Sequence, residues 1–107
     1  MDLHRLAELR SIAYHRAVAA KLRAEPGLVA AARERLDTWE RSGAAALVYI
    51  ARWRQKLALP IDELVAFLGE DDEEARELRQ STPFAGVIDP RERWRLWREV
   101  AESADTR

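Results

Sequence analysis

The sequence predicts an all-α protein, a compact bundle of five to six helices with a Pro/Gly loop leading into a Trp-containing C-terminal helix. Apolar residues recur at three- and four-residue spacing along most of the chain, and no segment alternates as a strand does. At 107 residues the chain has the size of one domain with a modest core. We expect residues 1–101 to form this domain and residues 102–107 to be a frayed tail.

The first predicted helix covers residues 2–24, with Asp2 as its cap and "EPG" as its stop. We expect one broad apolar face at helical spacing to point inward, and it consists of Leu3, Leu6, Leu9, Ala13, Ala17 and Ala20. His4 and His15 lie on the opposite stripe. They are eleven residues apart, which is about 16 Å along a helix and too far for both to bind one metal ion. This stripe should therefore face solvent.

Two amphipathic helices follow, over residues 27–41 and 44–58. Gly43 can take the left-handed conformation that ends the first of them. Arg54 lies in the middle of the apolar arc of the second. An arginine there needs an acceptor, so we expect a carboxylate or backbone carbonyl to bind it, within the chain or across an interface.

Two shorter helices are predicted next, over residues 60–68 and 71–80, with Pro60 in the first turn of the earlier one. Across the first five helices, we expect the centres of the apolar stripes to be buried together. These residues are Leu6, Leu9, Leu36, Trp39, Leu47, Ile50, Leu64 and Leu68.

The segment "STPFAGVIDP" is a loop whose direction is set by two prolines and Gly86. Asp89 then caps a helix that begins at Pro90. Phe84 in the loop and two tryptophans in the helix have two interpretations. Either they pack against the domain, which we favour, or they form a surface for a partner protein or a second copy. The helix also has a basic edge that we expect to be exposed: Arg91, Arg95 and Arg98.

Composition excludes several classes of protein. There is no cysteine, which rules out disulfides, thiolate zinc sites and cysteine nucleophiles. No apolar run reaches the roughly 18–20 residues of a membrane span, and the start lacks the features of a signal peptide. The excess of alanine and arginine suggests a GC-rich genome. We therefore expect a bacterial cytoplasmic protein.

Charge is segregated along the chain. Residues 1–60 hold 11 Lys/Arg against 6 Asp/Glu, residues 61–80 hold 2 against 8, and the remainder is balanced at 5 and 5. Such blocks are either solvated faces or surfaces for complementary charged partners. The sequence has no HExxH, Walker, GxSxG or DxDxDG motif, so we expect a protein that is not an enzyme and binds no cofactor or metal.

The segment "IARWRQKLALPIDELVAFLGEDDEEARELRQ" is similar to the helix-turn-helix of phage-repressor-type regulators. In such domains the second helix reads the bases. Here that helix, residues 71–80, carries five acids against two arginines. DNA affinity depends on neutralising phosphates, so an acidic helix opposes DNA binding. A DNA-binding regulator is the alternative hypothesis.

The chain also resembles small helical bacterial proteins encoded beside nucleotidyltransferase-like toxins. The resemblance lies in "LHRLAELRSIAYHR" at residues 3–16, in Trp39 and Trp53, and in "LRQSTPFAGVIDPRERWR" at residues 78–95. It implies a non-catalytic antitoxin or regulatory partner that neutralises the toxin by protein–protein contact. We expect the partner-binding residues to be Arg54, Phe84, Arg91, Trp94, Arg95, Trp97 and Arg98.

Overall fold

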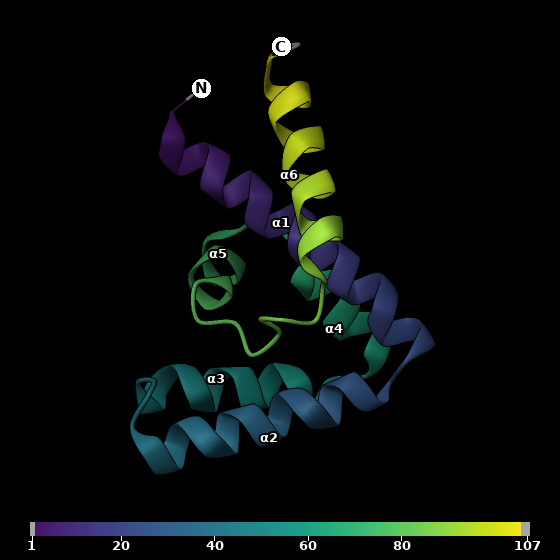
Figure 1. The fold of residues 1–107 in the computed structure, drawn as a ribbon. Helices are drawn as coiled ribbons and strands as arrows, with labels where there is room; N and C mark the ends of the chain where they lie inside the picture. Colours follow the sequence, from purple (N-terminus) through teal and green to yellow (C-terminus); the bar gives the residue numbers. More distant parts are fainter. Residues whose placement is uncertain (1, 106–107) are drawn as a thin grey trace.

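Residues 2–105 are described by a computed structural model, and they form six helices and no strand (Figure 1). This confirms the predicted fold class. The helices are α1 (Leu3–Ala24), α2 (Gly27–Ser42), α3 (Leu47–Leu57), α4 (Ile61–Leu68), α5 (Glu73–Arg79) and α6 (Pro90–Asp105). No helix in this part of the chain is both long and apolar enough to cross a membrane.

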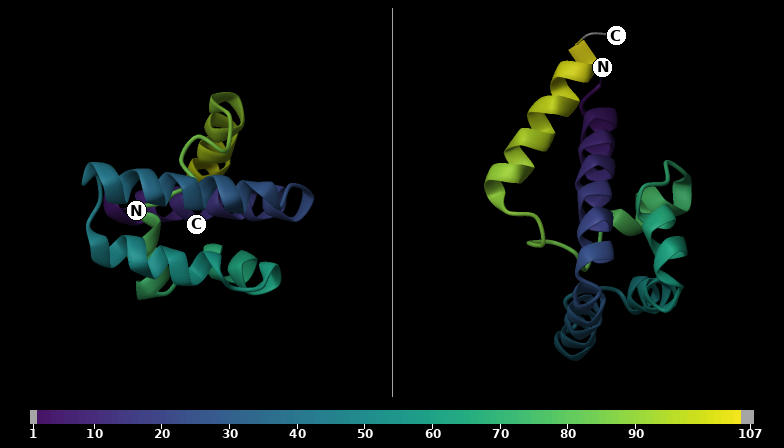
Figure 2. Two further views of the ribbon diagram at one scale, coloured as in Figure 1. Left: turned by 90° about the horizontal axis from the view of Figure 1, so that it is seen from below. Right: turned by 90° about the vertical axis from the view of Figure 1, so that its right-hand side faces the viewer.

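The long helix α1 organises the molecule. It packs against α4 on one side and against α6 on the other, and α2 and α3 lie side by side beneath it (Figure 1). Figure 2 shows α6 leaning along α1, with the start of α1 and the end of α6 at the same end. The loop between α5 and α6 crosses α1, so it joins the two sides of the bundle.

The helix ends follow the local signals in the sequence. Asp2 caps α1 by accepting a hydrogen bond from the backbone N–H of Arg5 at 2.8 Å. Gly43 ends α2 in the left-handed conformation, with φ 72°. Asp89 caps α6 by accepting from the backbone N–H groups of the second and third residues after it, at 2.9 and 3.0 Å. All three caps were predicted.

Several helix boundaries differ from the prediction by one to three residues. The third helix begins at Leu47 because Ala46 is extended, and Pro60 caps α4 instead of lying in its first turn. Asp72 caps α5, which makes that helix shorter than the predicted 71–80. Helix α6 continues to Asp105 and so includes the first four residues of the predicted tail, while residues 106–107 lie outside the described part.

Trp53 is the centre of the core. It is fully buried, and its ring makes edge-on contacts with Phe67 and Phe84, each with centroids 6.0 Å apart. Its indole N–H donates to the carbonyl of Leu78 at 3.0 Å. Phe84 is also fully buried. The loop therefore completes the core, which confirms the favoured interpretation of Phe84.

The predicted core is partly correct. Four of its residues are buried: Leu36, Ile50, Leu64 and Leu68. Leu6, Leu9 and Trp39 are only half-buried. Leu47 is 68% exposed because it is the first residue of α3, whose inward face consists of Ile50, Trp53 and Leu57.

The inward face of α1 was also predicted incorrectly. Leu3 is 82% exposed, and the buried residues of this helix are Ile12, His15, Val18, Ala19 and Leu22. His15 was expected to face solvent but is 2% exposed.

Candidate functional site

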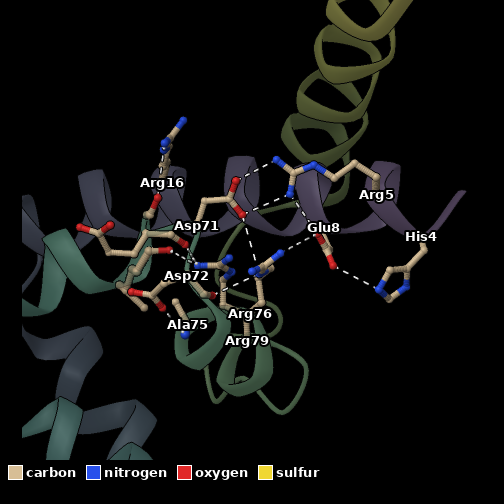
Figure 3. A network of polar contacts seen from close by, with 12 residues as sticks. His4, Arg5, Glu8, Arg16, Asp71, Asp72, Ala75, Arg76 and Arg79 are labelled. Atoms are coloured by element: carbon tan, nitrogen blue, oxygen red, sulfur yellow. Dashed lines mark hydrogen bonds and ion pairs between the residues drawn. The ribbon is translucent and has the colours of Figure 1, made fainter. Parts of the chain in front are cut away.

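A network of charged side chains joins α1 to the start of α5 (Figure 3). Arg5 pairs with Asp71 at 2.8 Å and with Glu8 at 2.9 Å, and Arg76 lies 3.6 Å from Glu8. The hydrogen bonds to Asp71 and Glu8 raise the pKa of Arg5. The same bonds lower the pKa values of Glu8 and Asp71. Acids of residues 61–80 are thus partnered by bases of residues 1–60.

The same pattern extends along α3 and α4. The further pairs are Arg23–Asp62 at 2.7 Å, Arg52–Glu77 at 3.3 Å and Lys56–Glu74 at 2.5 Å. The charge segregation along the sequence therefore becomes complementarity between helices of one chain. Four of the eight acids of residues 61–80 pair in this way, and their side chains remain 42–78% exposed.

His15 connects α1 to the loop before α6. Its Nδ1 lies 2.7 Å from the carbonyl oxygen of Ser11, and its Nε2 lies 2.8 Å from the hydroxyl of Thr82. A carbonyl only accepts, so Nδ1 carries the proton and Nε2 accepts from Thr82. The hydroxyl oxygen of Thr82 accepts in turn from the backbone N–H of Phe84 at 3.1 Å.

Tyr14 holds the same loop from the adjacent position. Its hydroxyl donates to the carbonyl of Phe84 at 2.7 Å and accepts from the backbone N–H of Ile88 at 3.5 Å.

Burial lowers the pKa of His15 to about 4, so the imidazole is neutral near pH 7. Tyr14 and His15 therefore fix the position of the segment that places Phe84 in the core.

A pocket of about 420 Å³ lies between α1, this loop and α6. Three arginines line it together with polar, small and aromatic residues, and no acid is among them. Its lining consists of Ala7, Arg10, Ser11, Tyr14, His15, Arg79, Thr82, Ala85, Gly86, Arg93 and Trp97.

Arg79 is the most deeply buried cation of this pocket, at 3% exposed. Its Nη1 donates to the carbonyl oxygens of Leu68 and Glu70, at 3.3 and 2.6 Å (Figure 3). Its Nε and Nη2 are buried and have no acceptor among residues 2–105. Burial lowers the pKa of Arg79, an effect that the nearby charges of Asp71 and Asp72 oppose.

Arg10 of α1 and Arg93 of α6 both lie beside Trp97 of α6. Their guanidinium carbons are 5.6 and 5.1 Å from the centre of the indole ring, a cation–π arrangement that links α1 to α6. The Nε atoms of both arginines are buried without an acceptor in the described part of the chain. The pocket therefore has three cationic side chains with donor capacity that the protein does not use.

The predicted partner-binding residues fall into different places. Arg91, Arg95 and Arg98 are exposed on α6, as expected. Trp94 is 60% exposed, and its ring meets the half-buried Trp97 edge-on at 5.7 Å. The favoured prediction that both indoles pack against the domain is correct for Trp97, which is half-buried against Arg10 of α1, and wrong for Trp94, which is mostly in solvent.

The two other predicted residues do not belong to this surface. Phe84 is fully buried, so it serves the core and cannot contribute to a surface in this conformation. Arg54 pairs with Asp37 at 2.9 Å and with Glu40 at 2.5 Å, which confirms the expected carboxylate partner. It lies on α3, at the opposite end of the molecule from α6 (Figure 1).

Sequence reasoning missed the pocket itself. Arg10, Arg79 and Arg93 are far apart in the sequence, and an arginine in an amphipathic helix ordinarily indicates a solvated face. A usable signal was the pairing of "AYHR" with "STPFAG" among the motifs that carry the resemblance, because the structure brings these two segments together.

Residues 2–105 contain no group of three or more His, Asp or Glu side chains that could hold a metal ion. The one histidine in the pocket has both ring nitrogens in hydrogen bonds to the protein. No protein-family model matches the chain, and neither does any curated protein or solved structure.

Proposed function

We propose that this protein is a non-catalytic protein–protein interaction module, the antitoxin or regulatory partner of a nucleotidyltransferase-like toxin encoded by an adjacent gene. The observation that carries the interaction role is the outward face of α6, where Trp94 is 60% exposed. The class of partner rests on the resemblance carried by residues 3–16 and 78–95.

The composition of this face supports binding to a protein. Trp94 has three exposed arginines near it on the same helix: Arg91, Arg95 and Arg98. Tryptophan and arginine are the residue types enriched in interface hot spots. Covering a large exposed aromatic ring with a partner removes apolar surface from water and so lowers the free energy of the complex. Figure 2 shows α6 standing at the edge of the bundle, where a partner can reach it.

The geometry of the pocket supports a role without catalysis. General acid–base chemistry needs a group that can exchange a proton near neutral pH. His15 is neutral, buried and hydrogen-bonded at both ring nitrogens. No carboxylate lines the pocket to orient or activate it.

The alternative of direct DNA reading has less support. The helix that would enter the groove, α5, has seven residues, and its exposed side chains include Glu73, Glu74 and Glu77. These acids repel the phosphates that a recognition helix approaches. Basic side chains of α1 and α3 that could bind phosphates are instead paired with acids of this segment.

As the partner of such a toxin, the protein would act in the bacterial cytoplasm. The test is to purify the chain with the product of the neighbouring nucleotidyltransferase-like gene and to measure complex formation and rescue of growth. We expect a stable complex, and we expect Trp94→Ala to weaken it at least tenfold while leaving the melting temperature unchanged. Arg41→Ala, on an exposed position of α2, is the matched control.

Tryptophan fluorescence adds a second measurement. Trp94 should emit as a solvated indole in the isolated chain and shift to the blue when the partner binds, a change that Trp94→Phe removes. Absence of a complex, or equal binding by Trp94→Ala and the control, refutes the proposed surface. Light scattering identifies self-association as the competing outcome, and a gel shift with the upstream promoter at low salt tests DNA binding.

A further inference from the structure

The pocket between α1, the loop and α6 has a net positive charge that nothing in its lining balances. Arg10, Arg79 and Arg93 each contribute one charge, His15 is neutral, and no acid is among the lining residues. This differs from the rest of the charged surface, where most cations on α1 and α3 have carboxylate partners at 2.5–3.3 Å.

Four nitrogen atoms of these arginines also lack a hydrogen-bond acceptor in the described part of the chain. Nε and Nη2 of Arg79 and the Nε atoms of Arg10 and Arg93 are all buried without an acceptor among residues 2–105. A buried charged N–H without an acceptor loses its hydration and has no hydrogen bond to replace it. Four such atoms around one pocket indicate a site that is stabilised when an anion occupies it.

The geometry of the donors points to an oxyanion. Nε and Nη2 of one guanidinium can donate side by side to two oxygens of a phosphate or carboxylate. With Arg10 and Arg93 the pocket supplies three positive charges, which suits a phosphate, whose charge at pH 7 is about −1.5 to −2. A carboxylate supplies a single negative charge and would leave two of the three positive charges unbalanced.

The size and walls of the pocket indicate that the ligand is larger than the phosphate alone. Its volume of about 420 Å³ lies within the roughly 300–1,000 Å³ of small-molecule sites. Trp97, Tyr14 and two alanines supply apolar wall beside the arginines. We propose that this pocket binds a phosphorylated small molecule, with its phosphate held by Arg10, Arg79 and Arg93 and its organic part against Trp97.

The three arginines of the pocket differ in exposure. Nε and Nη2 of Arg79 are covered in this conformation, whereas Arg10 and Arg93 are only half-buried. An entering phosphate therefore meets Arg10 and Arg93 more readily than Arg79. Since both lie against Trp97, binding should change the environment of that indole. This inference does not depend on the identity of the protein partner.

The decisive probe is inorganic phosphate, titrated into the full chain at constant ionic strength and followed by tryptophan fluorescence and calorimetry. We expect saturable binding at least ten times tighter than that of acetate, and a higher melting temperature with phosphate. AMP should bind about tenfold tighter than phosphate because its base can stack on Trp97, and adenosine, which has no phosphate, should not bind.

Charge-neutralising variants locate the site. Arg10→Gln and Arg93→Gln should each weaken phosphate binding about tenfold, whereas Arg91→Gln and Arg98→Gln, at exposed positions of α6, should leave it unchanged. Arg79→Lys keeps the charge but loses the paired donors, and it should weaken binding even where circular dichroism shows a folded protein. The absence of saturable phosphate binding, equal affinity for acetate, or an equal loss in Arg91→Gln would overturn the proposal.

Discussion

Lowering the pH from 7 to 4.5 should destabilise the fold through His15. Burial lowers the pKa of this imidazole from 6.5 to about 4, and the charge of Arg79 acts in the same direction. The unfolded chain therefore binds a proton between these two values that the folded chain does not bind. The contribution of neutral His15 is complete above pH 6.5 and is lost progressively as the pH falls toward 4.

The magnitude follows from the two pKa values. The interval from 6.5 to about 4 is worth about 3 kcal/mol at roughly 1.4 kcal/mol per pH unit. By pH 4.5 most of it, about 2.5 kcal/mol, should be lost. Hydrogen bonds lower the carboxyl pKa values of Glu8, Asp71 and Glu77, so the contribution of these acids begins to be lost near the ordinary carboxyl pKa values and is lost mainly below pH 4.5.

Urea unfolding at a series of pH values measures this loss. With a slope of about 1–3 kcal/mol per molar, the midpoint should fall by about 1–2 M between pH 7 and 4.5. His15→Gln should be less stable at pH 7 and nearly independent of pH in this range. His4→Gln is the matched control, because the side chain of His4 is 81% exposed. A wild-type midpoint that does not move, or a His15→Gln variant that keeps the full pH dependence, refutes the reasoning.

Three further predictions concern the loop, the core and one surface pair. Gly86→Ala should cost about 1–2 kcal/mol because φ is 84°, whereas Gly27→Ala, at a helix start with no neighbour within 4 Å, should not destabilise the protein; chemical unfolding compares the two. Phe84→Leu should cost about 1–3 kcal/mol in the same assay, and Leu47→Ala less than about 0.5 kcal/mol, because one side chain is buried and the other is 68% exposed. Arg54→Met should lower the melting temperature slightly at low salt and much less in concentrated salt, since its two carboxylate pairs are at the surface.

Sequence reasoning succeeded where the signal is local. Asp2, Gly43 and Asp89 end or begin helices through contacts within a few residues, and Gly86 has the positive φ that its place in a turn suggested. Phe84 was also placed correctly, because a loop bounded by two prolines restricts where its side chain can point. None of these depends on how the helices pack.

The inward face of α1 could not be found in this way. The rule that one apolar stripe faces the core assumes that a helix packs on one side, but α1 contacts α4 and α6 on opposite sides. Polar His15 was assigned to solvent because Thr82, the residue that satisfies it, is 67 positions away. Trp94 was misplaced for a related reason, since the amphipathic pattern does not reveal how much of the bundle a terminal helix touches.

Several arginines pair with a carboxylate within residues 2–105, whereas the three that line the pocket do not. Arg5, Arg23 and Arg54 have carboxylate partners within the chain, so their charges are used in holding helices together. Arg79 and Arg93 have none among the described residues, and both lie where α6 and the loop meet α1. Helix α6 thus carries Trp94 on its outward face, the proposed partner surface, and Arg93 at the pocket, the proposed anion site. Because α6 is held mainly by α1, an anion that bridges these arginines would also fix the orientation of the outward face, which links the two sites through one helix.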